Sequence, residues 1–181
     1  MGKSTRKLTL AALFSALAVV MLYVATLWPT GQLGLAAVAS LFVVAAVIES
    51  GLVSGLSVYI VSSLIAFLIV PNKAPVILFV LFFGYYPILK SLIEKRMKLV
   101  WQIIAKLAVF NISSTVAGYF LMELMLASIN DENGRVFTAF NSVIEQVIIY
   151  VIGSLVFLLF DYGMTKLIWF YINRISKNIP K

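Results

Sequence analysis

Long apolar runs, separated by very short polar breaks, constrain this chain more than any other feature of its sequence. A helix needs about 20 residues to cross the hydrocarbon core of a bilayer, and six stretches approach or exceed that length. They cover residues 8–28, 33–48, 52–70, 74–93, 99–127 and 140–171. Because lipid offers the backbone no hydrogen-bond partners, each run is predicted to be an α-helix. The expected fold class is therefore all-α, a polytopic integral membrane protein built as a six-transmembrane-helix bundle.

Composition agrees with this interpretation. Of the 181 residues, 62% are hydrophobic and only 12% are charged, whereas a soluble domain is about half apolar and roughly a quarter charged. Each polar break is about a dozen residues or shorter, which is too little chain for a separate folded unit. We therefore expect a single membrane domain over residues 1–181, located in the plasma membrane.

The first apolar run is predicted to be a retained helix, because it exceeds the apolar core of a signal peptide, which is about 7–15 residues long. Orientation follows from lysine and arginine, which favour cytoplasmic loops. With the N-terminus inside, that side collects Lys3, Arg6, Lys7, Lys90, Lys95, Arg96, Lys98, Lys166, Arg174, Lys177 and Lys181. The opposite side keeps Lys73 and Arg135, so both termini are expected in the cytoplasm.

The residue types that the chain lacks exclude several functional classes. The chain has no cysteine and no histidine, which removes disulfides, thiolate and imidazole metal ligands, and His or Cys catalysis. It has no phosphate-binding loop of the G-x-x-x-x-G-K-[ST] type, so ATP-driven work would need a partner's ATPase. The net charge of +7 does not indicate binding to nucleic acid, because the basic residues cluster beside apolar runs. At such positions the anionic headgroups of lipids are nearer partners than a nucleic acid. We expect no metal, no cofactor and no enzymatic activity.

Two pairs of small residues share the spacing that lets helix backbones approach closely in lipid. Ala12 and Ala16 form an A-x-x-x-A pair in the first run, for which packing within the bundle and contact with a separate subunit are equally open. Gly51 and Gly55 open the third run, with Ser62 and Ala66 further along. For this second pair, packing inside the protein is favoured.

Proline interrupts the fourth run at Gly84-Tyr85-Tyr86-Pro87. Proline lacks a backbone donor and frees a carbonyl one turn back, so a kink is expected there. Such a kink either lines a cavity or is a packing adjustment in which tyrosines hydrogen-bond a neighbouring helix.

Polar residues within the apolar runs are costly and therefore informative. The fifth run carries Asn111, Thr115 (or Ser114), Gly118 and Met122 on one stripe, which we expect to face the bundle interior. Near the inner boundary, Asp161 is expected to form a structural pair with Lys106 or Lys90, unless the lysines extend to the membrane surface.

Two glutamates, Glu123 and Glu145, are predicted at similar outer depth on neighbouring helices. Because charges at this depth usually mark a pathway, a site or an ion pair, they are candidates for a ligand site. Aromatic and polar residues expected on the same side could complete an outward-facing pocket: Trp28, Tyr119, Phe137, Phe140, Gln32, Asn72 and Asn141. The aromatics have an alternative role as an interfacial belt. Acid–base catalysis by the glutamates is disfavoured, since no nucleophile, metal or cofactor motif accompanies them.

The chain resembles the S components, the substrate-binding membrane subunits of energy-coupling factor (ECF) transporters. The resemblance covers the whole chain in length, six-crossing layout, basic N-terminus and lack of a nucleotide site, and its sharpest element is KLTLAALFSALA at residues 7–18. It implies that Ala12 and Ala16 contact the transmembrane T subunit, which carries two cytoplasmic ATPases. It also implies uptake of a vitamin or related small nutrient without bond chemistry in this chain. Absence of histidine disfavours the cobalt and nickel branch.

The resemblance further implies that the substrate binds near the outer face, under the first external loop. The positions that match this location form what we call the outer set: Trp28, Gln32, Asn72, Tyr119, Glu123, Asn141, Glu145 and Gln146. Two rival functions remain open. One is an MreD-like membrane scaffold, and the other is a stand-alone secondary carrier that uses the two glutamates, although no internal repeat of the kind found in many carriers is evident.

Overall fold

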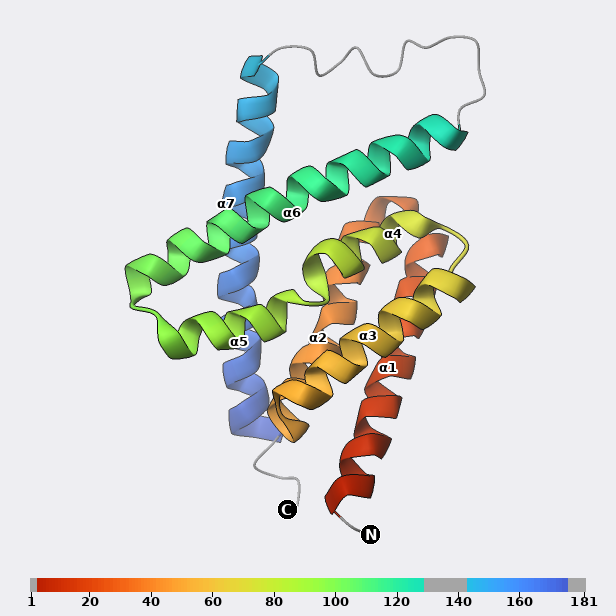
Figure 1. Cartoon of the computed structure of the whole chain (residues 1–181), viewed down its shortest axis with the longest axis vertical. Helices are drawn as coiled ribbons and strands as arrows, with labels where there is room; N and C mark the ends of the chain where they lie inside the picture. Colours follow the sequence, from red (N-terminus) through yellow and green to blue (C-terminus); the bar gives the residue numbers. More distant parts are fainter. Residues whose placement is uncertain (1–2, 129–142, 176–181) are drawn as a thin grey trace. The chain divides into compact units, whose positions relative to one another are not determined.

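The computed structural model describes residues 3–128 and 143–175, and within these residues the chain is helical with no strand. The elements are α1 (Lys3–Leu27), η1 (Pro29–Gly31), α2 (Gln32–Ser50), α3 (Leu52–Ile69), α4 (Lys73–Leu78), η2 (Phe79–Phe83), α5 (Tyr86–Arg96), α6 (Leu99–Ser128), α7 (Val143–Phe170) and η4 (Tyr171–Ile175) (Figure 1). The all-α fold class predicted from the sequence is confirmed.

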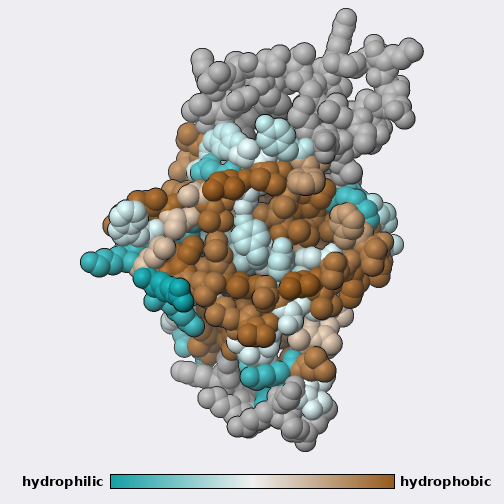
Figure 2. Space-filling view, in the orientation of Figure 1, coloured by the Kyte–Doolittle hydropathy of each residue, from teal (hydrophilic) through white to brown (hydrophobic). Residues whose placement is uncertain are grey.

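Six helical stretches among the described residues are long and apolar enough to cross a membrane. They are Thr5–Leu27, Gln32–Ser50, Leu52–Ile69, Lys73–Arg96, Val100–Phe120 and Tyr150–Asn173. The visible face is mostly hydrophobic, with strongly hydrophilic side chains confined to a few small groups (Figure 2). A surface of this kind suits lipid and not water, so the chain is a membrane-embedded helical protein.

The chain forms two compact units, Met1–Lys106 and Leu107–Lys181, and each is described by itself. The first unit contains α1 to α5 and the first two turns of α6. The second contains the rest of α6 together with α7 and η4. The expectation of one membrane domain over residues 1–181 stays a prediction.

In the first unit, α1, α2 and α3 pack against one another as successive antiparallel neighbours (Figure 1). The turn between α2 and α3 is a single residue, Gly51, whose φ of 94° lies in the left-handed region that favours glycine. The face of α1 that enters this packing carries Ala18, Leu22 and Ala25, all fully buried. Small side chains at the contact bring the helix backbones close together, which favours association in lipid.

Gly55 shows that the third helix uses its small residues inside the protein. A Cβ atom at this position would overlap Cγ2 of Val47 on α2, so only glycine permits the observed approach of α3 to α2. Ser62 and Ala66, further along the same helix, are fully buried. The prediction of internal packing is confirmed for Gly55, Ser62 and Ala66, whereas Gly51 is exposed in the turn before α3.

The fourth span is broken between α4 and α5, as the proline predicts. A π-helical segment, η2, precedes the break, and the Gly84 N–H donates to the Phe79 carbonyl five residues back at 2.7 Å. From α3, the hydroxyl of Tyr59 donates to the Val80 carbonyl at 2.9 Å. A Cβ at Gly84 would lie 2.6 Å from the Tyr59 ring, so the glycine makes room for this hydrogen bond. The contact with Tyr59 supports the packing interpretation of the kink, although this tyrosine comes from α3. The predicted hydrogen bonding by Tyr85 or Tyr86 stays a prediction.

In the second unit, α6 and α7 contact through aromatic and polar side chains. The rings of Phe110 and Phe157 stack with their centroids 4.7 Å apart and their planes at 12°. Gly153 lies beside the Phe110 ring, where a Cβ would be 3.4 Å from it. The hydroxyls of Thr115 and Tyr150 share a hydrogen bond of 2.7 Å. These contacts join the two helices within the unit.

The predicted orientation of the polar stripe of α6 toward the bundle interior stays a prediction. Within the second unit, Thr115 and Gly118 are exposed and Asn111 and Ser114 are half-buried, whereas Ser113 and Ala117 are buried. Met122 belongs to the same stripe, but its side chain lies outside the described part of the structure. Asn111 and Thr115 bond carbonyls of their own helix, and Thr115 also shares a hydrogen bond with Tyr150 of α7.

Candidate functional site

Three residues of the outer set, Trp28, Gln32 and Asn72, lie at the same end of the first unit, where α1 leads into α2 and α3 leads into α4. Trp28 precedes the short η1 turn and is 66% exposed. Gln32 is the first residue of α2 and is half-buried. The helix order thus brings these three to one end of the unit.

Asn72 has a structural role at that end. Its side-chain oxygen accepts a hydrogen bond from the Ala74 N–H at 3.0 Å and so caps α4. The adjacent Lys73 donates to the carbonyls of Phe67 and Val70, each at 2.7 Å. A cation at the last carbonyls of α3 is favourable, because these carbonyls carry the partial negative charge of the helix end. The loop between α3 and α4 is therefore fixed by its own polar residues.

The rest of the outer set belongs to the second unit. Tyr119 lies on α6 and is 71% exposed. The backbones of Glu123, Glu145 and Gln146 belong to α6 and α7, whereas their side chains, and the whole of Asn141, lie outside what the structure describes. The outer pocket that would bring the eight residues together stays a prediction.

The A-x-x-x-A pair of α1 lies outside the packed face of the helix. Ala12 and Ala16 are both exposed, whereas Ala18 and Leu22 are fully buried against the rest of the unit. Other residues of α1 therefore make its packing contacts within the first unit. The exposed pair leaves a shallow backbone surface that another helix can approach closely.

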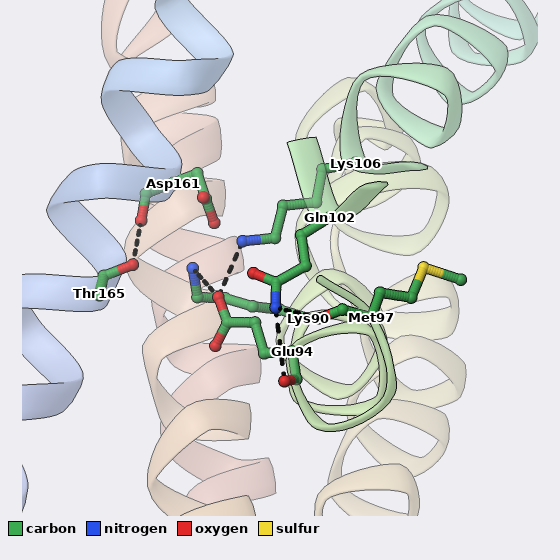
Figure 3. A network of polar contacts seen from close by, with 7 residues as sticks. All are labelled: Lys90, Glu94, Met97, Gln102, Lys106, Asp161 and Thr165. Atoms are coloured by element: carbon green, nitrogen blue, oxygen red, sulfur yellow. Dashed lines mark hydrogen bonds and ion pairs between the residues drawn. The ribbon is translucent and has the colours of Figure 1, made fainter. Parts of the chain in front are cut away.

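A cluster of charged side chains joins α5 to the start of α6 (Figure 3). One carboxylate oxygen of Glu94, Oε1, lies 3.0 Å from the Lys90 ammonium and 2.8 Å from the Lys106 ammonium. The side chains of both lysines are almost wholly buried, at 2% and 6% exposure, and that of Glu94 is 39% exposed. One anion shared by two buried cations stabilises the corner where α5 meets α6, because each buried charge requires a partner.

Glu94 is the residue that the sequence interpretation missed at this cluster. The signal was present, since Lys90 and Glu94 stand four residues apart and therefore share a helix face. The predicted pairing of Asp161 with either lysine stays a prediction. Asp161 accepts, through its backbone carbonyl, a hydrogen bond from the Thr165 hydroxyl at 2.8 Å (Figure 3).

A groove between α6 and α7 in the second unit, of about 420 Å³, is a further feature that the sequence did not single out. Its lining is mainly aliphatic, with three polar residues: Leu107, Asn111, Tyr150, Val151, Ser154, Leu155 and Leu158. The Asn111 amide nitrogen is bonded to the Leu107 carbonyl. The volume lies in the range of small-molecule sites, and the few polar groups suit a largely apolar occupant.

No cluster of three or more acidic, His or Cys side chains that could hold a metal ion occurs among the described residues. The fold and these features define a polytopic α-helical membrane protein. Comparisons with protein-family models, with curated proteins and with solved structures gave no match. Its function is therefore inferred from its own residues.

Proposed function

We propose that this chain is the substrate-binding S subunit of an ECF-type transporter and takes up a vitamin or a related small nutrient. The observation that carries the proposal is the exposure of Ala12 and Ala16 on α1, outside the face that packs within the first unit. Small residues at this spacing favour close contact between helices in lipid. A helix with one face packed inside its unit and a second small-residue face left open is suited to a partner subunit.

The proposed partners are a transmembrane T subunit and two ATPase subunits. The chain itself has no phosphate-binding loop, so the energy for uptake would come from the ATPases. The distribution of lysine and arginine supports cytoplasmic termini in the plasma membrane. With that orientation, Ala12 and Ala16 lie in the cytoplasmic half of α1, on the side where the ATPases work.

The substrate would bind at the opposite, outer end, where the helix order brings Trp28, Gln32 and Asn72 to one end of the first unit. The capped loop between α3 and α4 supports this assignment, because a fixed loop presents side chains to a ligand at low entropic cost. Binding would be followed by docking on the T subunit and reorientation within the membrane. No covalent step is assigned to this chain.

The interaction is tested by purifying the tagged protein from its host membranes and identifying what accompanies it by mass spectrometry. A T subunit and two ATPases should copurify with the unaltered chain and disappear with Ala12→Leu/Ala16→Leu. The matched control is Ser57→Leu/Ala108→Leu, which adds leucines at two exposed positions on α3 and α6. The control should retain the three partners.

Other outcomes separate the rival functions. Copurification of cell-wall or division proteins without any ATPase would replace the proposal by the MreD-like scaffold. Substrate transport by the purified chain alone in proteoliposomes would replace it by the stand-alone carrier. Retention of the T subunit by the Ala12→Leu/Ala16→Leu variant would show that this face of α1 does not bind the T subunit.

The binding site is tested separately by native mass spectrometry of the gently purified protein, which is expected to retain a small organic molecule. Glu123→Gln and Glu145→Gln should each reduce the retained fraction, because an ionised carboxylate forms hydrogen bonds about twice as strong as those of a neutral group. The control Glu49→Gln changes a glutamate of α2, outside the outer set. Unaltered retention in both Glu123→Gln and Glu145→Gln would show that the outer set is wrongly placed.

A further inference from the structure

The corner between α5 and α6 carries an exposed group of cations. Lys95 and Arg96 end α5, and Lys98 precedes α6 by one residue. All three side chains are exposed. No acidic residue pairs with them in the part of the chain that the structure describes. We call these three residues the corner cations.

The nearest carboxylate is already engaged. Glu94 holds the two buried ammonium groups of Lys90 and Lys106 through a single oxygen (Figure 3). Gln102 adds a second contact between the two helices. Its side-chain amide donates to the carbonyl of Met97, the residue that follows α5, at 2.8 Å. These contacts fix the two helices against each other. The corner cations are thus presented from a rigid turn.

The surroundings of the corner cations are those of a membrane interface. The two spans that meet here end at Arg96 and begin at Val100, so the corner lies where the chain leaves and re-enters the apolar layer. Trp101 is 64% exposed and Met97 is 46% exposed, directly beside the cations. Tryptophan favours the headgroup level of a bilayer, and long basic side chains extend to the same level.

We propose that the corner cations and Trp101 form a binding site for the phosphate of an anionic phospholipid headgroup. Lysine and arginine donate charge-assisted hydrogen bonds to phosphate oxygens, and Trp101 packs along the upper acyl chain. A bilayer lipid is favoured over a soluble phosphate because exposed apolar side chains flank the cations. The inference does not depend on the transport function.

Quenching of Trp101 fluorescence by lipids with brominated acyl chains tests the site. The chain has three tryptophans, so Trp28→Phe/Trp169→Phe leaves Trp101 as the reporter. The protein is reconstituted in phosphatidylcholine vesicles that contain a small fraction of brominated phosphatidylglycerol or, separately, brominated phosphatidylcholine. We expect phosphatidylglycerol to associate at least on the order of tenfold more strongly than phosphatidylcholine, since each basic residue near an anionic headgroup adds to the attraction.

Two pairs of substitutions make the test specific to the corner. Lys95→Gln/Lys98→Gln should lower the preference for phosphatidylglycerol several-fold, and Lys95→Arg/Lys98→Arg should keep it. Lys7→Gln/Lys166→Gln removes the same charge from two other exposed lysines and should leave it unchanged. Equal quenching by both lipids, or an equal loss in the two glutamine variants, would overturn the site. If millimolar soluble glycerol phosphate competes with the brominated lipid, the site binds a free phosphate, and the proposal of a lipid site is overturned.

Discussion

The packed interior of the first unit and the outer face of α1 use the same sequence device in opposite ways. Both carry small residues four apart, at Gly51 and Gly55 where α3 begins and at Ala12 and Ala16 on α1. Gly55 is buried against Val47 so closely that no side chain fits. The two alanines, by contrast, are exposed. Spacing alone therefore identifies a surface for close helix contact and does not identify the partner.

The difference between the two faces lies in the neighbouring chain. A one-residue turn at Gly51 folds α3 directly back on α2, so Gly55 meets a helix that is already adjacent, whereas Gly51 is itself exposed in the turn. For α1, the face with Ala18 and Leu22 takes up the contacts with α2 and α3. The interior should therefore tolerate added bulk much less than the outer face. Of the four predictions below, given in order of decreasing effect on stability, the first and the last test this contrast.

Gly55→Ala should destabilise the protein most, by about 2–3 kcal/mol, because the added methyl overlaps the stiff, β-branched side chain of Val47. The measurement is the free energy of unfolding in mixed detergent micelles. Gly34→Ala is the matched control, since a Cβ there meets nothing within 4 Å. Adding Val47→Ala to the Gly55→Ala variant should recover part of the loss. Equal stability of Gly55→Ala and Gly34→Ala would show that the close contact of Gly55 with α2 does not limit the size of the side chain there.

Glu94→Gln should cost about 2 kcal/mol of unfolding free energy. Removing one partner of a buried ion pair usually costs about 3–5 kcal/mol, and the 39% exposure of the Glu94 side chain lowers the effect. Lys95→Gln, at the exposed neighbouring position, should change stability by less than about 0.5 kcal/mol. Adding Lys106→Met to Glu94→Gln should restore stability in part, because one of the two buried cations is then gone. A loss at Lys95→Gln as large as at Glu94→Gln would contradict the shared ion pair.

Tyr59→Phe should cost about 1 kcal/mol, the typical contribution of one hydrogen bond between helices in a membrane. The substitution removes the hydroxyl that bonds the Val80 carbonyl in η2 and keeps the ring that lies against Gly84. Tyr23→Phe, on the exposed side of α1, is the control and should be neutral. Equal unfolding free energies for the two variants would show that the π-helical segment is stable without this bond.

Much of the fold followed from local sequence. The lengths of the apolar runs predicted the helices, and Pro87 predicted the broken helix. The sequence did not place the π-helical segment at residues 79–83. Its position depends on Tyr59, which comes from another helix and bonds one particular carbonyl. A contact between segments 21 residues apart leaves no pattern in the local sequence.

The candidate site was less accessible to sequence reasoning, because depth along a span does not select the partner of a polar side chain. The sequence interpretation considered Asp161 for Lys90 and Lys106, and the structure adds Glu94, which bonds both ammonium groups. Asn72 was predicted in the outer set, and its side-chain oxygen also caps α4. These contacts depend on side-chain geometry, which depth along the span does not give.

Ala12→Leu/Ala16→Leu should have the smallest effect on stability and the largest effect on assembly. Both positions are exposed, so the added side chains meet no neighbour and the unfolding free energy of the isolated protein should change by less than about 0.5 kcal/mol. Leucine also has a good helix propensity, so α1 should remain intact. Copurification of a T subunit and its ATPases should nevertheless be lost, because bulky side chains hold a partner backbone away. A loss of stability comparable to that of Gly55→Ala would instead place the alanine pair inside the protein's own packing and remove the contrast between the two faces.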